Sequence, residues 1–272
     1  MKTILITGAS SGIGKATAIY FQQKGWNVIA TMRTPQNETE LTAFQNIKLV
    51  QLDVTDDKSI ENATSESIKL FGGVDVVVNN AGYGAVGAFE AATQAQIKRQ
   101  FDTNLFGLMN VTKAFLPHFR SKKAGLFINI SSIGGAVTFP TFSLYHSTKW
   151  AVEGFSESLG FELAELGIGV KIVQPGGVKT DFAGRSLDWL VNPDIKDYDA
   201  TLEKIQKVFS NPERANNYST SEMIAEVIFE AATDGKKQMR YLAGADAVQL
   251  YQTRRALSND EFIEMIKTNF LG

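Results

Sequence analysis

Short runs of Val, Ile and Leu alternate along the chain with longer segments in which apolar residues recur every three or four positions. The short runs predict strands, and their continuous apolar character is typical of a parallel sheet that is covered on both faces. The longer segments have the period of amphipathic helices. About seven strands are expected, at residues 3–7, 27–32, 47–54, 74–82, 125–132, 169–177 and 239–244. The main helices are expected at residues 13–25, 56–72, 93–122 and 145–167.

This alternation predicts a Rossmann-type α/β fold, a doubly wound parallel sheet, because right-handed crossovers place helices on both of its faces. No linker or internal repeat divides the 272 residues, so we expect one domain over residues 1–272. The alternation is weakest over residues 181–237, which contain two Asn-Pro breaks and several aromatic residues. Insertions after the carboxyl end of a strand often contact substrate. We therefore interpret residues 181–237 as a variable substrate-loop region or lid, with a surface excursion as the alternative.

Composition excludes several classes of function. The chain has no cysteine and only two histidines, so we expect no metal site and no disulfide. A net charge of −2 does not favour nucleic acid or a membrane surface as a partner. No apolar run is as long as a membrane span, and the run after Lys2 is too short for a secretory signal. We expect a cytoplasmic protein that acts on a small molecule.

The first predicted strand leads directly into TGASSGIG, residues 7–14. A dinucleotide pyrophosphate needs close approach of the backbone, N–H groups that point at it and a helix N-terminus behind it. Glycine permits both the turn and the approach. The spacing is G-x-x-x-G-x-G instead of the more general G-x-G-x-x-G, and a tight strand–helix turn is the alternative. The residues expected to contact the cofactor here are Gly8, Ser10, Ser11, Gly12, Ile13 and Gly14.

The end of the second predicted strand indicates which dinucleotide is bound. NAD-binding proteins usually have an acidic residue there, which accepts a hydrogen bond from the ribose 2′-hydroxyl. This chain has Met32 and Arg33 instead. A guanidinium suits a 2′-phosphate because it can bind it with two parallel hydrogen bonds. Arg33 therefore favours NADP(H), and a solvated surface arginine is the alternative.

Tyr145 and Lys149 are four residues apart, so they share one face of a predicted helix, and Ser132 ends the fifth predicted strand. An ammonium about 4 Å away contributes on the order of 4 kcal/mol at an effective dielectric of 20. That is sufficient to lower the pKa of a phenol from about 10 to near neutrality. The pair could thus serve as an acid–base without a metal, although Tyr-x-x-x-Lys pairs are also common on ordinary helices.

Together these motifs resemble the short-chain dehydrogenase/reductase family, in its shorter, single-domain branch. The resemblance covers about residues 3–180 and includes motifs in the family's order. These are TGASSGIG (7–14), LDVTD (52–56), NNAG (79–82), Asn104 in NLFG, Ser132, YHSTK (145–149) and PGGVKT (175–180).

The resemblance implies a role for each matching residue. Tyr145 would be the acid–base, and Lys149 would lower its pKa and bind the nicotinamide ribose. Ser132 would polarise the carbonyl, and Asn104 would hold a water in a proton relay through Lys149. The cofactor would also contact Asp53 and Val54 at the adenine, Asn80, Ala81 and Gly82 in the middle, and Pro175, Gly176, Val178 and Thr180 at the nicotinamide.

The expected activity is NADP(H)-dependent interconversion of a ketone or aldehyde and an alcohol, and most specifically reduction of apolar carbonyl compounds. Aromatic residues in loops near the motifs suggest an apolar substrate pocket: Tyr83, Phe139, Phe142, Phe182 and Trp189. The alternatives are a non-catalytic NADP(H)-binding sensor and an NAD-dependent alcohol or steroid dehydrogenase. The resemblance also implies a homodimer or homotetramer formed through the helices at residues 93–120 and 145–166.

Overall fold

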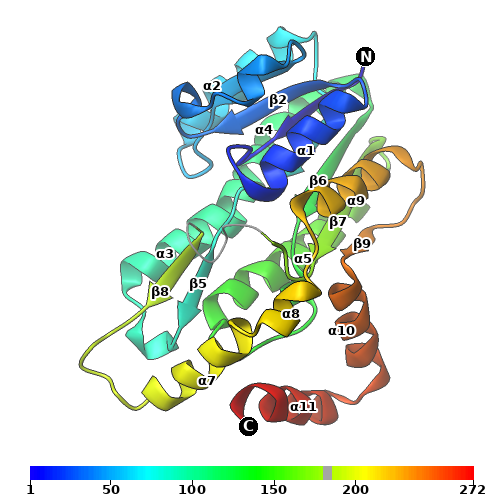
Figure 1. The fold of residues 1–272 in the computed structure, drawn as a ribbon. Coiled ribbons are helices and arrows are strands. Elements are labelled where there is room, and N and C mark those ends of the chain that lie inside the picture. The colour runs from blue at the N-terminus through cyan, green and yellow to red at the C-terminus, as the bar shows by residue number, and fades with distance from the viewer. Residues whose placement is uncertain (180–185) are drawn as a thin grey trace.

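The computed structural model describes residues 1–179 and 186–272. Within these residues, seven parallel strands form one sheet in the order β3-β2-β1-β4-β6-β7-β9. Figure 1 shows this sheet with helices packed against it. The chain starts in the middle of the sheet, proceeds to one edge, and then returns past its start to the other edge. This doubly wound topology confirms the predicted Rossmann-type fold.

The strands of this sheet are the continuous apolar runs of the sequence. Every residue of β1 (Thr3–Ile6) is buried, and so is every residue of its neighbour β4 (Val76–Asn79). Because helices cover both faces, these strands have no solvated side that would require polar residues. The other strands are β2 (Asn27–Met32), β3 (Ile47–Gln51), β6 (Gly125–Ile130), β7 (Ile168–Pro175) and β9 (Arg240–Ala243).

One face of the sheet is covered by α1 (Gly12–Gln23) and α9 (Ser221–Thr233), which lie side by side in Figure 1. Phe21 of α1 and Ile228 of α9 are fully buried in the same apolar core. Since α9 belongs to this layer, the excursion predicted over residues 181–237 is shorter than expected and ends before Ser221.

The opposite face is covered by α2 (Asp57–Leu70), α4 (Gly107–Lys122) and α5 (Ser143–Ala164). A second core lies between these helices and the sheet, with Phe115, Phe119 and Phe127 fully buried in it. None of the helices in residues 1–179 and 186–272 is both long enough and apolar enough to cross a membrane.

The long helix predicted over residues 93–122 is not continuous. It begins with a capping box at Thr93, runs as α3 (Gln94–Phe101), passes through a π-helical turn, η4 (Asp102–Phe106), and continues as α4. The π-helical turn contains Asn104. Single π turns are rare in helices and frequently occur at functional sites.

Most of the remaining elements gather beyond the carboxyl ends of the strands (Figure 1). A two-stranded parallel sheet pairs β5 (Gly84–Gly87) with β8 (Leu187–Leu190). The helices there are α7 (Asp199–Phe209), α8 (Pro212–Asn216), α10 (Ala245–Ala256) and α11 (Asn259–Leu271). Short 3-10 turns are η1 (Pro35–Asn37), η2 (Leu41–Ala43), η3 (Phe89–Ala91) and η5 (Ile133–Gly135).

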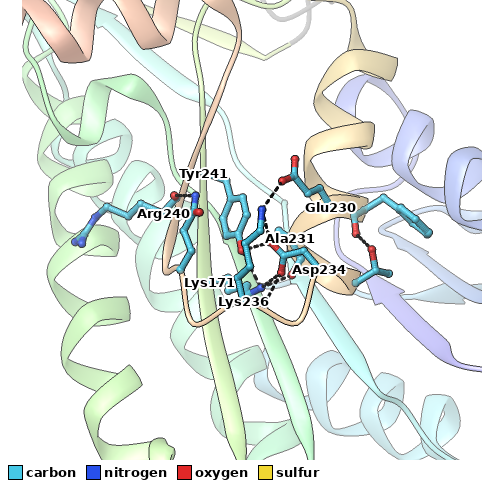
Figure 2. A network of polar contacts seen from close by, with 10 residues as sticks. Lys171, Glu230, Ala231, Asp234, Lys236, Arg240 and Tyr241 are labelled. Atoms are coloured by element: carbon cyan, nitrogen blue, oxygen red, sulfur yellow. Dashed lines mark hydrogen bonds and ion pairs between the residues drawn. The ribbon is translucent and has the colours of Figure 1, made fainter.

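A buried polar network fastens α9 to the edge of the sheet (Figure 2). The Lys171 ammonium on β7 donates to Ala231 O and Asp234 Oδ1, both at 2.8 Å, and to Tyr241 Oη at 2.9 Å. The Tyr241 hydroxyl on β9 in turn donates to Asp234 Oδ2 at 2.8 Å. One lysine thus ties two strands to the end of a helix.

Candidate active site

The glycine-rich turn after β1 has the geometry of a cradle for a phosphate. Gly8 has a φ of +67° and Gly12 a φ of +52°, values that side chains disfavour. A Cβ at Gly14 would lie 2.4 Å from Gly8 O and 2.6 Å from Asn80 Nδ2, so only glycine fits. Ser11 caps α1 without a side-chain hydrogen bond, and the first turn carries no acidic residue. The turn therefore presents backbone N–H groups at a helix N-terminus, which suits a dinucleotide pyrophosphate.

Asn80 and Thr7 hold this turn in place. The Asn80 amide donates to Thr7 O at 2.9 Å and to Gly8 O at 3.1 Å. The Thr7 hydroxyl accepts hydrogen bonds from the backbone N–H groups of Asn80 at 2.9 Å and Ala81 at 3.0 Å. Asn80, which was predicted to contact the middle of the cofactor, thus positions the glycine-rich turn. Thr7 was not predicted as a site residue, although it stands at the end of β1.

The adenosine end of the predicted site lies at β2 and β3. Arg33 is exposed, and in the described part of the chain its guanidinium has no hydrogen bond or ion pair. The Asp53 carboxylate accepts hydrogen bonds from the Thr55 backbone and hydroxyl at 2.9 and 2.7 Å. Val54 is buried, and a Cβ at Gly107 would lie 2.8 Å from Val54 O.

The structure brings Ser132, Tyr145 and Lys149 together. Ser132 follows β6 and caps η5, and its Oγ accepts a hydrogen bond from Gly134 N at 3.0 Å. The Tyr145 hydroxyl is hydrogen-bonded to Ser132. The Lys149 Nζ lies 5.7 Å from the centre of the Tyr145 ring and donates to Ile130 O at 2.9 Å.

The acid–base chemistry of this cluster differs from the sequence-based expectation. Burial raises the pKa of Tyr145 above its usual value near 10, and the hydrogen bond with Ser132 offsets this only in part. Burial lowers the pKa of Lys149 to about 8, although the Glu153 carboxylate opposes that shift. Because the pKa of Tyr145 is raised, the phenol is protonated near neutral pH.

The Asn104 side chain is fully engaged with protein groups. Its Oδ1 accepts from Tyr83 N at 3.0 Å, and its Nδ2 donates to Tyr83 O at 2.8 Å and to Thr148 Oγ1 at 3.3 Å. The π-helical turn thereby fixes the segment that leads into β5 and connects it to α5. The water-relay role of Asn104 stays a prediction.

The loop after β7, which is predicted to contact the nicotinamide, is fixed by a residue that sequence reasoning missed. Asp246, in the first turn of α10, accepts a hydrogen bond from Gly177 N at 2.6 Å. A Cβ at Gly176 would lie 2.3 Å from Asp246 Oδ1, so Gly176 is required for this approach. The only sequence signal was an acidic residue after Gly244 at a helix start. Val178 pairs with Ser219, whereas Thr180 lies outside the described residues.

The predicted aromatic pocket is divided between two places, and Phe182 lies outside the described residues. Tyr83 lies at the small sheet, where its hydroxyl accepts from Arg99 Nε at 3.2 Å, and Trp189 of β8 is 48% exposed. Phe139 and Phe142 belong to an aromatic cluster with two C-terminal residues. Its ring-centre distances are 5.2 Å for Phe139–Phe270, 5.1 Å for Phe142–Phe209 and 6.3 Å for Phe142–Tyr145.

His146 is a structural residue beside this cluster. Its Nε2 accepts from Phe139 N at 3.0 Å, so its Nδ1 carries the proton toward Gly134 O, 2.9 Å away. Burial lowers the pKa of His146 to about 4, which keeps the ring neutral. A groove of about 580 Å³ lies next to it, but its lining includes neither Ser132 nor Tyr145. This groove is therefore not assigned to substrate.

A doubly wound sheet with this glycine turn and this Ser–Tyr–Lys cluster defines a nicotinamide-dependent oxidoreductase. The family model described as short chain dehydrogenase matches residues 2–190. The chain belongs to the short-chain dehydrogenase family.

Similar proteins agree with this assignment. A 3-ketodihydrosphingosine reductase of Bacteroides thetaiotaomicron is 39% identical over 212 residues, which are 78% of this chain and 77% of that protein. A short-chain dehydrogenase from Streptomyces avermitilis superposes with a TM-score of 0.85 at 34% identity, over 98% of this chain and 96% of that one. ElxO with NADP bound gives a TM-score of 0.74 at 28% identity, over 93% and 99% of the two chains.

Proposed function

We propose that the protein is an NADP(H)-dependent carbonyl reductase for apolar ketones or aldehydes. The observation that carries the proposal is the contact of Tyr145 with Ser132 and Lys149, at the same edge of the sheet as the glycine turn. The family's nicotinamide cofactor supplies hydride when bound. The other tasks, which are to donate a proton and to orient the carbonyl, belong to the protein's own side chains.

The protonation states favour reduction. A Tyr145 phenol that keeps its proton near neutral pH is ready to donate it to a carbonyl oxygen. Ser132 can donate a second hydrogen bond to the same oxygen, which orients and polarises the carbonyl. The Lys149 ammonium then stabilises the phenolate that remains on Tyr145.

Two observations support NADP(H) over NAD(H). Arg33 stands where an acidic residue would accept the ribose 2′-hydroxyl, and its guanidinium is exposed without a partner in the described residues. The structural neighbour ElxO has been crystallised with NADP. A free guanidinium beside the adenosine end can bind a 2′-phosphate with two hydrogen bonds.

An apolar substrate is supported by the surroundings of Tyr145. Phe142 is in contact with the Tyr145 ring and continues through Phe209 into the aromatic cluster. The Phe142 and Phe209 rings on this side of Tyr145 are apolar, and His146 beside them is neutral. One relative is named for the reduction of a ketone, 3-ketodihydrosphingosine.

The test is NADPH oxidation with pairs of ketones matched in size, one member apolar and the other carrying a carboxylate or hydroxyl groups. The wild type should have the higher kcat/KM for the apolar member, and Tyr145→Phe should lose at least about 100-fold in kcat while it still binds NADPH. Tyr20→Phe, at an unrelated position of α1, is the control and should retain full activity. Activity of Tyr145→Phe within tenfold of the wild type would remove the acid–base assignment, and preference for the polar members would remove the apolar pocket.

A further inference from the structure

Glu153 is a buried carboxylate that the proposed chemistry does not use. It lies on α5, one helical turn beyond Lys149, and is only 7% exposed. A carboxylate in such a place requires compensation by a cation or by hydrogen bonds. Its surroundings therefore show what the carboxylate is for.

Groups from two strands hold Glu153 from the side of the sheet. Gln174 Nε2 on β7 donates to Glu153 Oε1 at 3.1 Å, and Arg240 Nε on β9 donates to Oε2 at 2.9 Å. Arg240 also pairs with the more exposed Glu157, one turn further along α5. Both oxygens of Glu153 are thus fixed in position.

The turn that carries Ser132 closes over the same carboxylate. A Cβ at Gly135 would lie 2.8 Å from Glu153 Cγ and 3.1 Å from its Oε1, so glycine is needed where η5 passes this side chain. Ser132 caps that turn. Glu153 thus connects α5, the catalytic helix that carries Tyr145 and Lys149, to the serine turn and to strands β7 and β9.

Lys149 has little other compensation for its charge. Its ammonium is buried and, among residues 1–179 and 186–272, donates to one neutral acceptor, Ile130 O. Burial lowers the pKa of Lys149 to about 8, and the charge of Glu153 is what raises it again. Without that charge, the lysine would lose its proton at a still lower pH.

We propose that Glu153 is a positioning residue that keeps the Lys149 ammonium charged and holds the serine turn against the catalytic helix. The inference rests on the function proposed for Tyr145 and Lys149. It assigns to the Arg240–Glu153 pair a part in tuning the active site, beyond docking β9 onto α5.

The other charged groups near α5 are engaged elsewhere. Within the described residues, the charged side chains on elements packed against α5 form ion pairs. These pairs are Asp102 with Lys98, Arg99 with Asp188, Lys171 with Asp234, and Arg240 with Glu153 and Glu157. On α5 itself, His146 is neutral. Glu153 is therefore the charge through which Lys149 can be tuned.

The test is a titration of Lys149 by NMR in the full-length protein, with Lys149→Met to assign its signal. In Glu153→Gln, Lys149 should titrate about one pH unit lower, a tenfold easier loss of its proton. In Arg240→Gln it should titrate higher, because Glu153 then acts on the lysine without a competing cation. Glu157→Gln removes the other carboxylate bound by Arg240 and should leave the Lys149 titration nearly unchanged.

Kinetics with the preferred ketone provide the second arm. The alkaline limb of kcat in Glu153→Gln should move down by the same pH interval, with activity at about pH 6 within twofold of the wild type and about fivefold lower at about pH 8. Glu153→Asp should restore part of the shift. If the Arg240–Glu153 pair were merely structural, Glu153→Gln and Arg240→Gln would both be less stable and the Lys149 titration would not move. That result would overturn the inference. A shifted Lys149 titration with an unchanged pH profile of kcat would also overturn it.

Failure of the proposed function would look different. A wild type that reduces no carbonyl compound would overturn that function, whereas the titration arm would still decide whether Glu153 sets the charge of Lys149.

Discussion

Lys171 and Lys149 are both buried lysines, on opposite faces of the same sheet, and their surroundings differ. The Lys171 ammonium donates to three protein acceptors, one of them the Asp234 carboxylate (Figure 2). Lys149 donates to one backbone carbonyl, and burial lowers its pKa to about 8.

The difference separates a structural cation from a functional one. All three N–H groups of Lys171 are used to fasten α9 to β7 and β9, so this lysine has nothing left to offer a ligand. Lys149 keeps donor capacity at the edge of the sheet where cofactor and substrate would meet. Perturbed and incompletely bonded groups of this kind are typical of active sites, where stability is sacrificed for chemistry.

The largest effect on activity is expected from Lys149→Met. Loss of the ammonium should reduce kcat by about 100-fold or more, because the Tyr145 phenolate would lose its stabilising charge. The free energy of unfolding should stay the same or rise by about 1–4 kcal/mol, since an apolar side chain replaces a poorly compensated charge. Steady-state kinetics and urea denaturation check both. If Lys149→Met were clearly less stable than the wild type and had a normal kcat, Lys149 would be a structural lysine and the contrast with Lys171 would be wrong.

Lys171→Met should give the opposite pattern. It removes the buried cation that donates to Asp234 and leaves only the exposed Lys236 near this carboxylate, so the free energy of unfolding should fall by about 3–5 kcal/mol. Activity per folded molecule should not change. The matched control is Lys236→Met, which removes the exposed cation 3.7 Å from Asp234 and should cost about 1 kcal/mol or less. Equal losses of stability in Lys171→Met and Lys236→Met would mean that the burial of the Lys171–Asp234 pair does not add to its effect on stability.

Arg33 extends the comparison to an exposed cation without a partner in the described residues. Arg33→Ala should weaken NADPH binding relative to NADH binding by about 1.5–3 kcal/mol, the usual contribution of a hydrogen bond to a charged group. Stability should be unaffected because the guanidinium holds no other group. Fluorescence titration with both cofactors measures the difference, and an equal loss for the two would refute the role of Arg33.

The smallest effect is expected in the pH dependence of stability below about pH 5. Burial raises the pKa of Asp234, but hydrogen bonds from Lys171, the Lys236 backbone and Tyr241 outweigh it and hold the pKa well below the usual value. A lowered carboxyl pKa stabilises the fold above the unfolded-state pKa near 4 and loses this contribution as the pH falls below it. The stability difference between the wild type and Asp234→Asn should therefore narrow from about pH 5 to about pH 3. Urea denaturation at several pH values measures this difference. If Asp234 were not ionised in the folded protein, the difference in stability between the wild type and Asp234→Asn would stay constant over this pH range.

Local sequence patterns predicted the parts of the site that depend on neighbouring residues. The glycine turn follows its strand directly, and Tyr145 and Lys149 are placed on one helical face by their spacing of four. The doubly wound parallel sheet was predicted as well, because apolar runs joined by helices permit few topologies. These features need no knowledge of distant contacts.

Features made by distant segments were not predictable in this way. Asp246 reaches Gly177 across 69 positions of the chain, and Phe270 closes on Phe139 from the last helix. No periodicity connects these residues. The raised pKa of Tyr145 was also missed, because the spacing of Tyr145 and Lys149 does not show how far the phenol is desolvated.

The π-helical turn at Asp102–Phe106 has a consequence for how this chain tolerates insertions and deletions. A π turn holds one residue more than an α-helical turn of the same span. Removing a single residue there would let the helix run on regularly, at little local cost, but would rotate everything before it by roughly 100° about the helix axis. Asn104 would then face away from Tyr83, and the small sheet of β5 and β8 would lose its tie to the catalytic helix. The one additional residue in the π-helical turn, which looks dispensable in a sequence alignment, therefore keeps Asn104 oriented toward Tyr83 and the small sheet connected to α5.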